Sequence, residues 1–253
     1  MLKFSKKVDI ILPNYNSSLY LEETINSIIR QNYKNWKLII VDDASNNETK
    51  DILKKYSKLK KIKTYMLKKN HGAGYCRNYA IKRSKSPYLA FIDSDDLWKK
   101  NKLKNQISYM EKNNYQFTYT CYKTFGLGKK KLITPPSKLN FFNFIHNTSI
   151  GTSTMMVKRK AINQIKFTNS KVCEDFYFKC KILKKVGYAY NLKQYLTKYR
   201  IRKNSLQSNN LKNFYWIWKI NRDYNKLNFF SNLISILCIT FNSLKKDGGK
   251  NIF

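Results

Sequence analysis

Acidic residues are scarce in this 253-residue chain, and nearly half of them lie in three tight clusters. The chain has 15 aspartates and glutamates against 50 lysines and arginines. Seven of the acids form the clusters Asp42-Asp43, Asp93/Asp95/Asp96 and Glu174-Asp175. Because adjacent carboxylates repel each other, such clusters usually bind a cation or accept hydrogen bonds. They are therefore the first candidates for chemistry.

The cluster Asp93, Asp95 and Asp96 directly follows the apolar dipeptide Phe91-Ile92. An Asp-x-Asp at the end of a strand places two carboxylates on the same side of the chain. Their hard oxygens suit Mg²⁺ or Mn²⁺, which bind through one or two carboxylates plus substrate phosphates. Such a metal neutralises the charge that develops on a departing diphosphate. We expect this role for Asp93 and Asp95, whereas Asp96 could simply be a helix N-cap.

The other two clusters are more ambiguous. Asp42 and Asp43 could cap the next helix, but together with the other clusters they favour a ligand role for one of the two. Glu174-Asp175 precedes a helical, aromatic stretch. Its charges could complement the helix dipole, or one of them could be a general base that takes a proton from an attacking hydroxyl. Spacing alone favours neither interpretation.

Alternating strands and helices must position these clusters. The sequence predicts strands at Val8–Leu12, Trp36–Val41, Ile62–Leu67 and Tyr88–Ile92, and helices at Ser18–Arg30, Asn47–Ser57 and Gly72–Ser84. Strands that are apolar throughout and separated by helices predict an α/β fold with a mostly parallel sheet covered on both faces. Ligands bind beyond the carboxyl ends of such strands. The motifs PNYN, DDAS and DSDD lie at those ends.

The pattern changes after about residue 115. We predict strands at Gln116–Tyr122 and Thr152–Val157, a loop at Thr124–Pro136, a helix at Glu174–Val186 and a mainly helical region from Asn209 to Lys246. No internal repeat or linker marks a second domain. We therefore predict one domain over residues 1–208, with two halves that meet near residue 115, followed by a helical, amphipathic segment at 209–253.

The net charge of +35 favours acidic partners. Only seven of the 50 basic residues are arginines, the residues that most often bind phosphates and base edges. We therefore expect no nucleic-acid binding. A solvated cationic surface with some attraction to anionic membranes fits better. The five cysteines are scattered, and the N-terminal MLKFSKKVDIIL does not resemble a signal peptide. Both observations favour a reducing cytoplasm.

An ordered series of motifs gives a resemblance to a known family. ILPNYN (11–16), VDDAS (41–45), NHGAGYCRNYAI (70–81), FIDSDDLW (91–98) and CEDFYF (173–178) resemble the inverting family 2 glycosyltransferases of the GT-A fold. The resemblance covers residues 8 to about 205, and it implies a nucleotide-sugar half at about 1–115 and an acceptor half at about 116–208. It implies transfer of a sugar from a nucleotide-sugar donor, commonly a UDP-sugar, to an acceptor hydroxyl. Assembly of a bacterial surface polysaccharide or lipooligosaccharide is the expected setting, with a saccharide or lipid-linked acceptor.

The resemblance also implies a donor role for several residues. Pro13 and the backbone around Asn14 and Tyr15 match the loop that holds the base and ribose. Asp42 matches an aspartate that hydrogen-bonds the uracil ring, and Arg77 matches a basic residue near the nucleotide.

The motif carboxylates complete this assignment. Asp93 matches the ribose-side carboxylate of the D-x-D motif, and Asp95 matches the carboxylate that binds Mn²⁺ or Mg²⁺. Asp175 matches the catalytic base, with Glu174 as its neighbour. We expect Asp175 to deprotonate the acceptor hydroxyl, which attacks the anomeric carbon opposite the nucleotide and inverts its configuration. The segments Phe141–Ile145 and Gly151–Met156 would help to select the acceptor.

One segment departs from the family pattern. KYRIRKNSLQSNN (198–210) resembles a motif that often reads Y-R-x-H-x-x-S, but Arg202 stands where a histidine is common. A guanidinium can clamp a diphosphate with two hydrogen bonds, but it cannot be a metal ligand.

Two other classes of protein fit this sequence less well. A nucleotidyltransferase would carry a glycine-rich basic loop after its first strand, where this chain has PNYN. A non-catalytic basic module that binds nucleotides or nucleic acid would have no reason to place carboxylates at successive strand ends.

The C-terminal segment has a composition suited to a surface. Phe229–Leu244 contains ten apolar residues, and its polar residues fall mostly on one side at helical spacing. At 16 residues it is shorter than the roughly 20 that a spanning helix needs. Lys245 and Lys246 follow it. Two interpretations are equal at this point: peripheral docking on an anionic membrane surface, or packing on the catalytic domain or a second subunit. The sequence predicts no oligomeric state.

Overall fold

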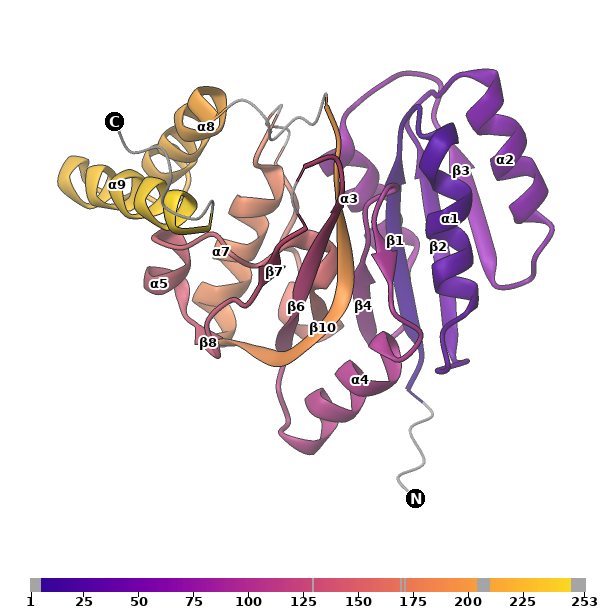
Figure 1. The fold of residues 1–253 in the computed structure, drawn as a ribbon, viewed down its shortest axis with the longest axis horizontal. Helices are drawn as coiled ribbons and strands as arrows, with labels where there is room; N and C mark the ends of the chain where they lie inside the picture. The colour runs from indigo at the N-terminus through magenta and orange to yellow at the C-terminus, as the bar shows by residue number, and fades with distance from the viewer. Residues whose placement is uncertain (1–5, 129, 169, 171, 204–209, 247–253) are drawn as a thin grey trace.

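The computed structural model describes residues 6–128, 130–168, 170, 172–203 and 210–246, and it confirms the predicted α/β fold (Figure 1). The elements of the first half are β1 (Val8–Asn14), α1 (Ser18–Ile29), β2 (Trp36–Asp42), α2 (Asn47–Ser57), β3 (Ile62–Met66), α3 (Ala73–Arg83), β4 (Tyr88–Phe91), β5 (Leu97–Trp98) and α4 (Lys102–Lys112). Those of the second half are β6 (Phe117–Gly126), β7 (Leu132–Ile133), β8 (Lys138–Leu139), α5 (Phe141–Ile145), the 3₁₀ helix η1 (Thr152–Thr154), β9 (Met156–Lys158), α6 (Arg159–Ile162), α7 (Glu174–Val186), β10 (Ala189–Ile201), α8 (Asn210–Asp223) and α9 (Phe229–Lys246).

One ten-stranded sheet runs through the described part of the chain, with eight strands in the order β3-β2-β1-β4-β9-β6-β10-β5. The strands β3, β2, β1 and β4 are parallel, and Asn14 lies in register with Asp42. β9 is antiparallel to β4 and β6, whereas β10 is parallel to β6. The carboxyl ends of β1, β2 and β4 therefore meet at one edge of the sheet, where the polar motifs follow them.

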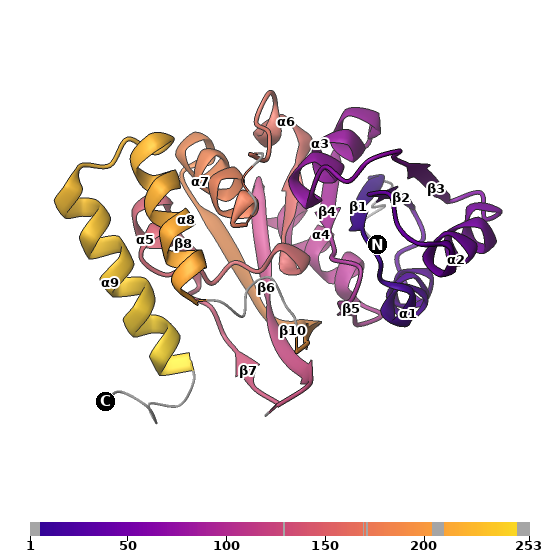
Figure 2. The ribbon, with the colours of Figure 1, turned by 90° about the horizontal axis from the view of Figure 1, so that it is seen from above.

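Two hydrophobic cores lie on opposite faces of this sheet. Val8, Ile10 and Leu12 belong to the core that includes residues of α1, α2 and α4, whereas Ile11 belongs to the core with α3, α5 and α7. Successive side chains of a strand point to opposite faces, so a strand with helices on both sides is apolar throughout. Figure 2 shows these helices on both sides of the strands.

The acceptor half differs from the prediction in several places. β6 continues to Gly126 and pairs with β7, so the predicted loop 124–136 is in part a hairpin. Thr152–Thr154 is a 3₁₀ turn rather than a strand, because Thr154 bonds the Gly151 carbonyl through both its amide and its hydroxyl. Hydroxyl side chains compete with strand pairing in this way. β10 and α4 were not predicted at all.

The short strand β5 explains the position of the DSDD motif. Leu97 and Trp98 pair with Lys198 and Thr197 of β10, so no helix begins at Asp96 and the predicted N-cap role is wrong. Instead the Asp96 carboxylate accepts a hydrogen bond from the amide of Arg200, 2.9 Å away. The loop between β4 and β5 is thereby fixed to the end of β10.

The C-terminal helices α8 and α9 lie at the end of the molecule opposite α2 and β3 in both views (Figures 1 and 2). They contact each other, and α9 also bonds the segment that follows α5. No helix among the described residues is both long enough and apolar enough to cross a bilayer. The predicted boundary at residues 208 and 209 lies outside the described residues.

Candidate active site

A cavity of about 730 Å³ lies at the carboxyl ends of β1 and β4. On one side it is lined by Pro13, Asn14 and Tyr15 and by the motif carboxylates Asp93 and Asp95. On the other side it is lined by Thr148 to Thr154 and by Glu174 and Asp175, the first two residues of α7. The fold thus places the second and third acidic clusters of the sequence on the wall of one cavity.

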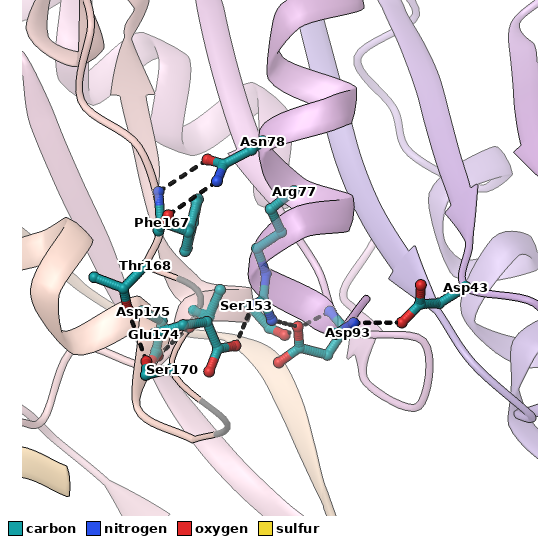
Figure 3. A network of polar contacts seen from close by, with 12 residues as sticks. Asp43, Arg77, Asn78, Asp93, Ser153, Phe167, Thr168, Ser170, Glu174 and Asp175 are labelled. Atoms are coloured by element: carbon teal, nitrogen blue, oxygen red, sulfur yellow. Dashed lines mark hydrogen bonds and ion pairs between the residues drawn. The ribbon is translucent and has the colours of Figure 1, made fainter. Parts of the chain in front are cut away.

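Arg77 joins the two sides of this cavity. It is buried in α3 and donates to Asp93 Oδ1 through one terminal nitrogen and to Glu174 Oε1 through the other, each at 2.6 Å (Figure 3). Burial alone would lower its pKa, but Asp93, Glu174 and Asp175 together raise the pKa of the guanidinium above its ordinary value. Arg77 also lines the cavity, and its charge is bonded to two carboxylates, so its contact with a nucleotide stays a prediction.

The first turn of α7 begins at an unusual backbone position. Cys173 has a φ of 59°, in the left-handed region that a residue with a side chain seldom adopts, and Glu174 and Asp175 follow at once. Gly74 of α3 lies against this turn, because a Cβ there would be 2.6 Å from the Thr168 carbonyl oxygen and 3.0 Å from Glu174 Cγ. Close packing of these two helix starts brings Glu174 within reach of Arg77.

Asp175 has a defined set of partners. Its Oδ2 accepts hydrogen bonds from the Thr152 hydroxyl at 2.6 Å and from the buried Lys179 ammonium at 2.5 Å. Burial raises the pKa of Asp175, but Lys179, Thr152 and Arg77 outweigh burial and hold the pKa below its ordinary value. One oxygen of the carboxylate is therefore fixed, and no described residue bonds the other.

The DSDD loop carries two more arginine contacts. Arg202 Nε lies 2.7 Å from Asp95 Oδ2, and Arg200 Nε donates to the Asp95 carbonyl at 2.8 Å. Burial and the neighbouring Asp93 raise the pKa of Asp95, and Arg202 opposes them. Arg202 lines the cavity, so the segment that departs from the family motif does reach the site. The rest of that motif, residues 204–209, lies outside the described part of the chain.

The donor set fits a divalent cation that shares its coordination with a substrate. Asp93 and Asp95 each engage a guanidinium through one carboxylate oxygen, which leaves a second hard oxygen on each at the cavity. No group of three or more metal-ligating side chains occurs among the described residues. Mg²⁺ and Mn²⁺ suit such a site, because they keep several waters and bind with one or two carboxylates plus phosphates.

The aspartates at the end of β2 have separate positions. Asp42 is fully buried, accepts hydrogen bonds from Asn14 Nδ2 and from the amide and hydroxyl of Ser45, and does not line the cavity. Asp43 does line it, and its carboxylate accepts the backbone amides of His71 and Gly72 before α3. The contact between Asp42 and a base therefore stays a prediction, and Asp43 is the member of the pair that reaches the cavity.

Several residues of the site were not found from the sequence. Lys179 lies one helical turn after Asp175, and this i, i+4 spacing was a usable signal. Thr152 and Ser153 lie in the segment Gly151–Met156, which was expected to help select the acceptor. Their bonds to Asp175 and Asp93 were not predicted, because these depend on the 3₁₀ turn that replaces the predicted strand. Ser153 accepts the Asp93 amide at 3.0 Å, so this turn supports both the motif carboxylate and, through Thr152, Asp175.

Comparison with known proteins decides the family. Residues 9–166 match the family described as Glycosyl transferase family 2. This chain belongs to that family. It is 34% identical over 250 residues to TuaG of Bacillus subtilis (strain 168), a glycosyltransferase assigned to teichuronic acid biosynthesis, covering 97% of this chain and 99% of TuaG.

Two further similarities add detail. The chain is 33% identical over 222 residues to WfgD of Escherichia coli, named as a UDP-Glc:alpha-D-GlcNAc-diphosphoundecaprenol beta-1,3-glucosyltransferase, covering 86% of each protein. Its fold is similar to that of S. aureus TarS residues 1–349 in complex with UDP-GlcNAc, with a TM-score of 0.74 and 23% identity over 94% of this chain and 73% of TarS. The GT-A fold and the family predicted from the motifs are confirmed.

Proposed function

We propose that this family 2 enzyme transfers a sugar from a UDP-sugar to a hydroxyl of a lipid-linked saccharide, with inversion, during bacterial surface-polysaccharide synthesis. The observation that carries the proposal is the single cavity whose wall holds Asp93 and Asp95 on one side and Asp175 on the other. A donor bound through its diphosphate at the motif carboxylates would place its sugar toward Asp175.

The donor side suits a nucleoside diphosphate. The loop at Pro13 to Tyr15 lies at the carboxyl end of β1, where α/β sheets bind nucleotides. Arg202 supplies a partly exposed guanidinium beside Asp95. A divalent cation bound at Asp95 would neutralise charge on the leaving UDP. The UDP-GlcNAc complex of TarS and the UDP-Glc in the name of WfgD support a UDP-sugar as the donor.

The acceptor side suits a single displacement. Thr152 and Lys179 hold one oxygen of Asp175, so the carboxylate keeps one orientation while the other oxygen accepts the proton of the acceptor hydroxyl. With the base on the side of the sugar opposite the diphosphate, the attack inverts the anomeric carbon in one step. Glu174 is bonded to Arg77, so its role in this proposal is to position Asp175 and Arg77.

The setting follows from the relatives. WfgD is named for an acceptor carried on diphosphoundecaprenol, and TuaG for teichuronic acid biosynthesis. An enzyme with such an acceptor would work at the cytoplasmic face of a membrane. No nucleic-acid partner is part of this proposal.

The proposal is tested by nucleotide binding and then by transfer. UDP should raise the unfolding temperature in the presence of Mn²⁺ and much less without it. Asp95→Ala should remove the Mn²⁺-dependent part of that shift and leave the unfolding temperature of the free protein nearly unchanged, because one metal anchor is lost at the surface of a cavity. A metal-dependent UDP shift of wild-type size in this variant would contradict the assignment of Asp95.

Donor and stereochemistry need a second measurement. A set of UDP-sugars is offered with a lipid-diphosphate saccharide acceptor, and the anomeric configuration of the product is read by NMR. A product with the configuration of the donor would exclude the single displacement.

A further inference from the structure

The helix α9 presents its polar side to the protein and its apolar side to solvent. Ser235 is buried and donates to the Ile145 carbonyl at 2.6 Å, and Asn232 is buried and donates to the Trp218 carbonyl at 3.0 Å. Asn242 donates to the His146 carbonyl at 2.9 Å. The side of the helix that a soluble protein usually exposes is therefore the side that holds α9 in place.

The opposite side of α9 is an exposed apolar stripe. Phe230, Leu237 and Phe241 are 74%, 60% and 54% exposed, at positions that share one helix face. We call the full set the α9 stripe; it consists of Phe229, Phe230, Leu233, Ile234, Leu237 and Phe241. Exposed apolar side chains gathered on one element mark a binding surface more often than isolated ones do.

We infer that the α9 stripe docks the enzyme on the surface of an anionic lipid bilayer. Residues 210–246 contain six lysines and arginines and a single acid, Asp223, which is paired with Arg222 at 2.8 Å. Basic residues beside an apolar helix face are attracted to anionic headgroups.

The charge of the chain also favours an anionic bilayer over a second copy of the chain as the partner of the α9 stripe. Two copies that meet at the α9 stripe would each bring a net charge of +35, with an excess of basic residues in the contacting helices themselves. Like charges at an interface oppose association, whereas an anionic bilayer removes the same repulsion. Because the polar side of α9 is bonded to the protein, only its apolar side can meet a bilayer, and α9 then lies along the surface.

Docking at the α9 stripe would bring the cavity close to a lipid-linked acceptor, and this step rests on the proposed function. Phe214 and Ile217 of α8 and Ile239 and Ser243 of α9 line the far end of the cavity. The inner side of this helix pair thus forms the acceptor wall, while the outer side of α9 is the stripe. A helix is about 10 Å across, so a lipid-linked saccharide at that wall would be close to the bilayer that carries it.

Vesicle co-sedimentation tests the inference. The probes are vesicles of phosphatidylcholine alone and vesicles with about one third phosphatidylglycerol, at low salt and at about 0.5 M salt, where exposed charge is screened. The wild-type chain should bind the anionic vesicles and keep part of that binding at high salt. Phe230→Ser/Leu237→Ser/Phe241→Ser should bind about tenfold or more weakly, because insertion of apolar side chains is lost.

A matched control removes three exposed apolar side chains from the nucleotide half, as Leu19→Ser/Leu59→Ser/Met66→Ser, and should bind like the wild type. Both variants should keep the wild-type unfolding temperature, since only exposed side chains change. Equal binding by both variants would overturn the inference in favour of diffuse lysine charge. A stripe variant that binds vesicles normally but changes from oligomer to monomer in sedimentation velocity would overturn it in favour of a second copy. Vesicle binding uses neither donor nor acceptor, so failure here leaves the UDP and Mn²⁺ test of function untouched.

Discussion

At the scale of single residues, the adjacent carboxylates Glu174 and Asp175 have different partners. Asp175 is bonded to a hydroxyl and an ammonium through the same oxygen, whereas Glu174 is bonded to Arg77. Spacing alone could not show which member of the pair is the base, and only the family resemblance assigned Asp175. The difference in partners supports Asp175.

Replacement of Asp175 by asparagine tests this difference. Asparagine keeps the shape but cannot accept the proton, so kcat should fall by about 10²- to 10⁴-fold while the dissociation constant for the UDP-sugar stays nearly unchanged. The control Glu174→Gln keeps the base and should lose less activity. A loss of donor affinity of about tenfold or more in Asp175→Asn, roughly 1.4 kcal/mol, would instead place Asp175 in the nucleotide site.

Lys179 should set the pH dependence of transfer. In the wild type the pKa of Asp175 is held below its ordinary value, so the base stays ionised over the whole working range. Lys179→Met removes the ammonium, while burial, Glu174 and the contacts with Thr152 and Arg77 remain, so the pKa of Asp175 should rise. The acid limb of the kcat/KM profile should then move to higher pH.

The matched control for this profile is Lys185→Met, which removes an exposed lysine from the same helix. Its pH profile should follow the wild type. If Lys179→Met lowers kcat at every pH by the same factor, then Lys179 holds the helix together without tuning the base.

At the scale of elements, prediction succeeded where one simple period dominated. The bounds of α2 and α7 were predicted to the residue, because apolar spacing and flanking polar residues agree there. β10 was missed because polar residues, among them Lys193 and Lys198, interrupt its apolar ones and because its register with β6 is interrupted near Asn191 and Tyr195. No local pattern shows that a strand so far along the chain will fix Asp96.

The close approach of α3 to α7 depends on Gly74, although helix propensity alone would favour alanine at this position. Gly74→Ala should gain about 1 kcal/mol in helix propensity. The new Cβ would nevertheless meet the Thr168 carbonyl oxygen at 2.6 Å, so backbone must move and Glu174 with it. We expect a lower unfolding temperature and a lower kcat, measured together.

A second variant in the same helix separates stability from positioning. Ala80→Gly removes a buried methyl group and lowers helix propensity, but it lies away from Glu174. It should lower the unfolding temperature and leave kcat nearly unchanged. Higher stability and full activity in Gly74→Ala would show that the loop at Thr168 adapts to the methyl group.

At the scale of the whole molecule, the fold does little to reduce the repulsion between its positive charges. Among the described residues, the buried ion pairs gather around the cavity, and the exposed pairs, such as Lys54 with Asp51 and Lys55 with Glu22, are few. Exposed pairs contribute about 0–1 kcal/mol each. A net charge of +35 repels itself throughout the compact state.

The unfolding temperature of the free enzyme should therefore rise with ionic strength. The Debye length is about 30 Å at about 0.01 M salt and about 10 Å at about 0.1 M. Added salt therefore screens repulsion across the molecule before it weakens contacts of 2.5 to 2.9 Å, such as those of Lys179 and Lys54. Thermal unfolding is followed by circular dichroism without nucleotide, in sodium chloride and in potassium chloride, which should give the same shift because screening depends on ionic strength. A fall in unfolding temperature over this range would mean that attractive pairs outweigh the repulsion. The excess of lysine would then not lower the stability of the folded state.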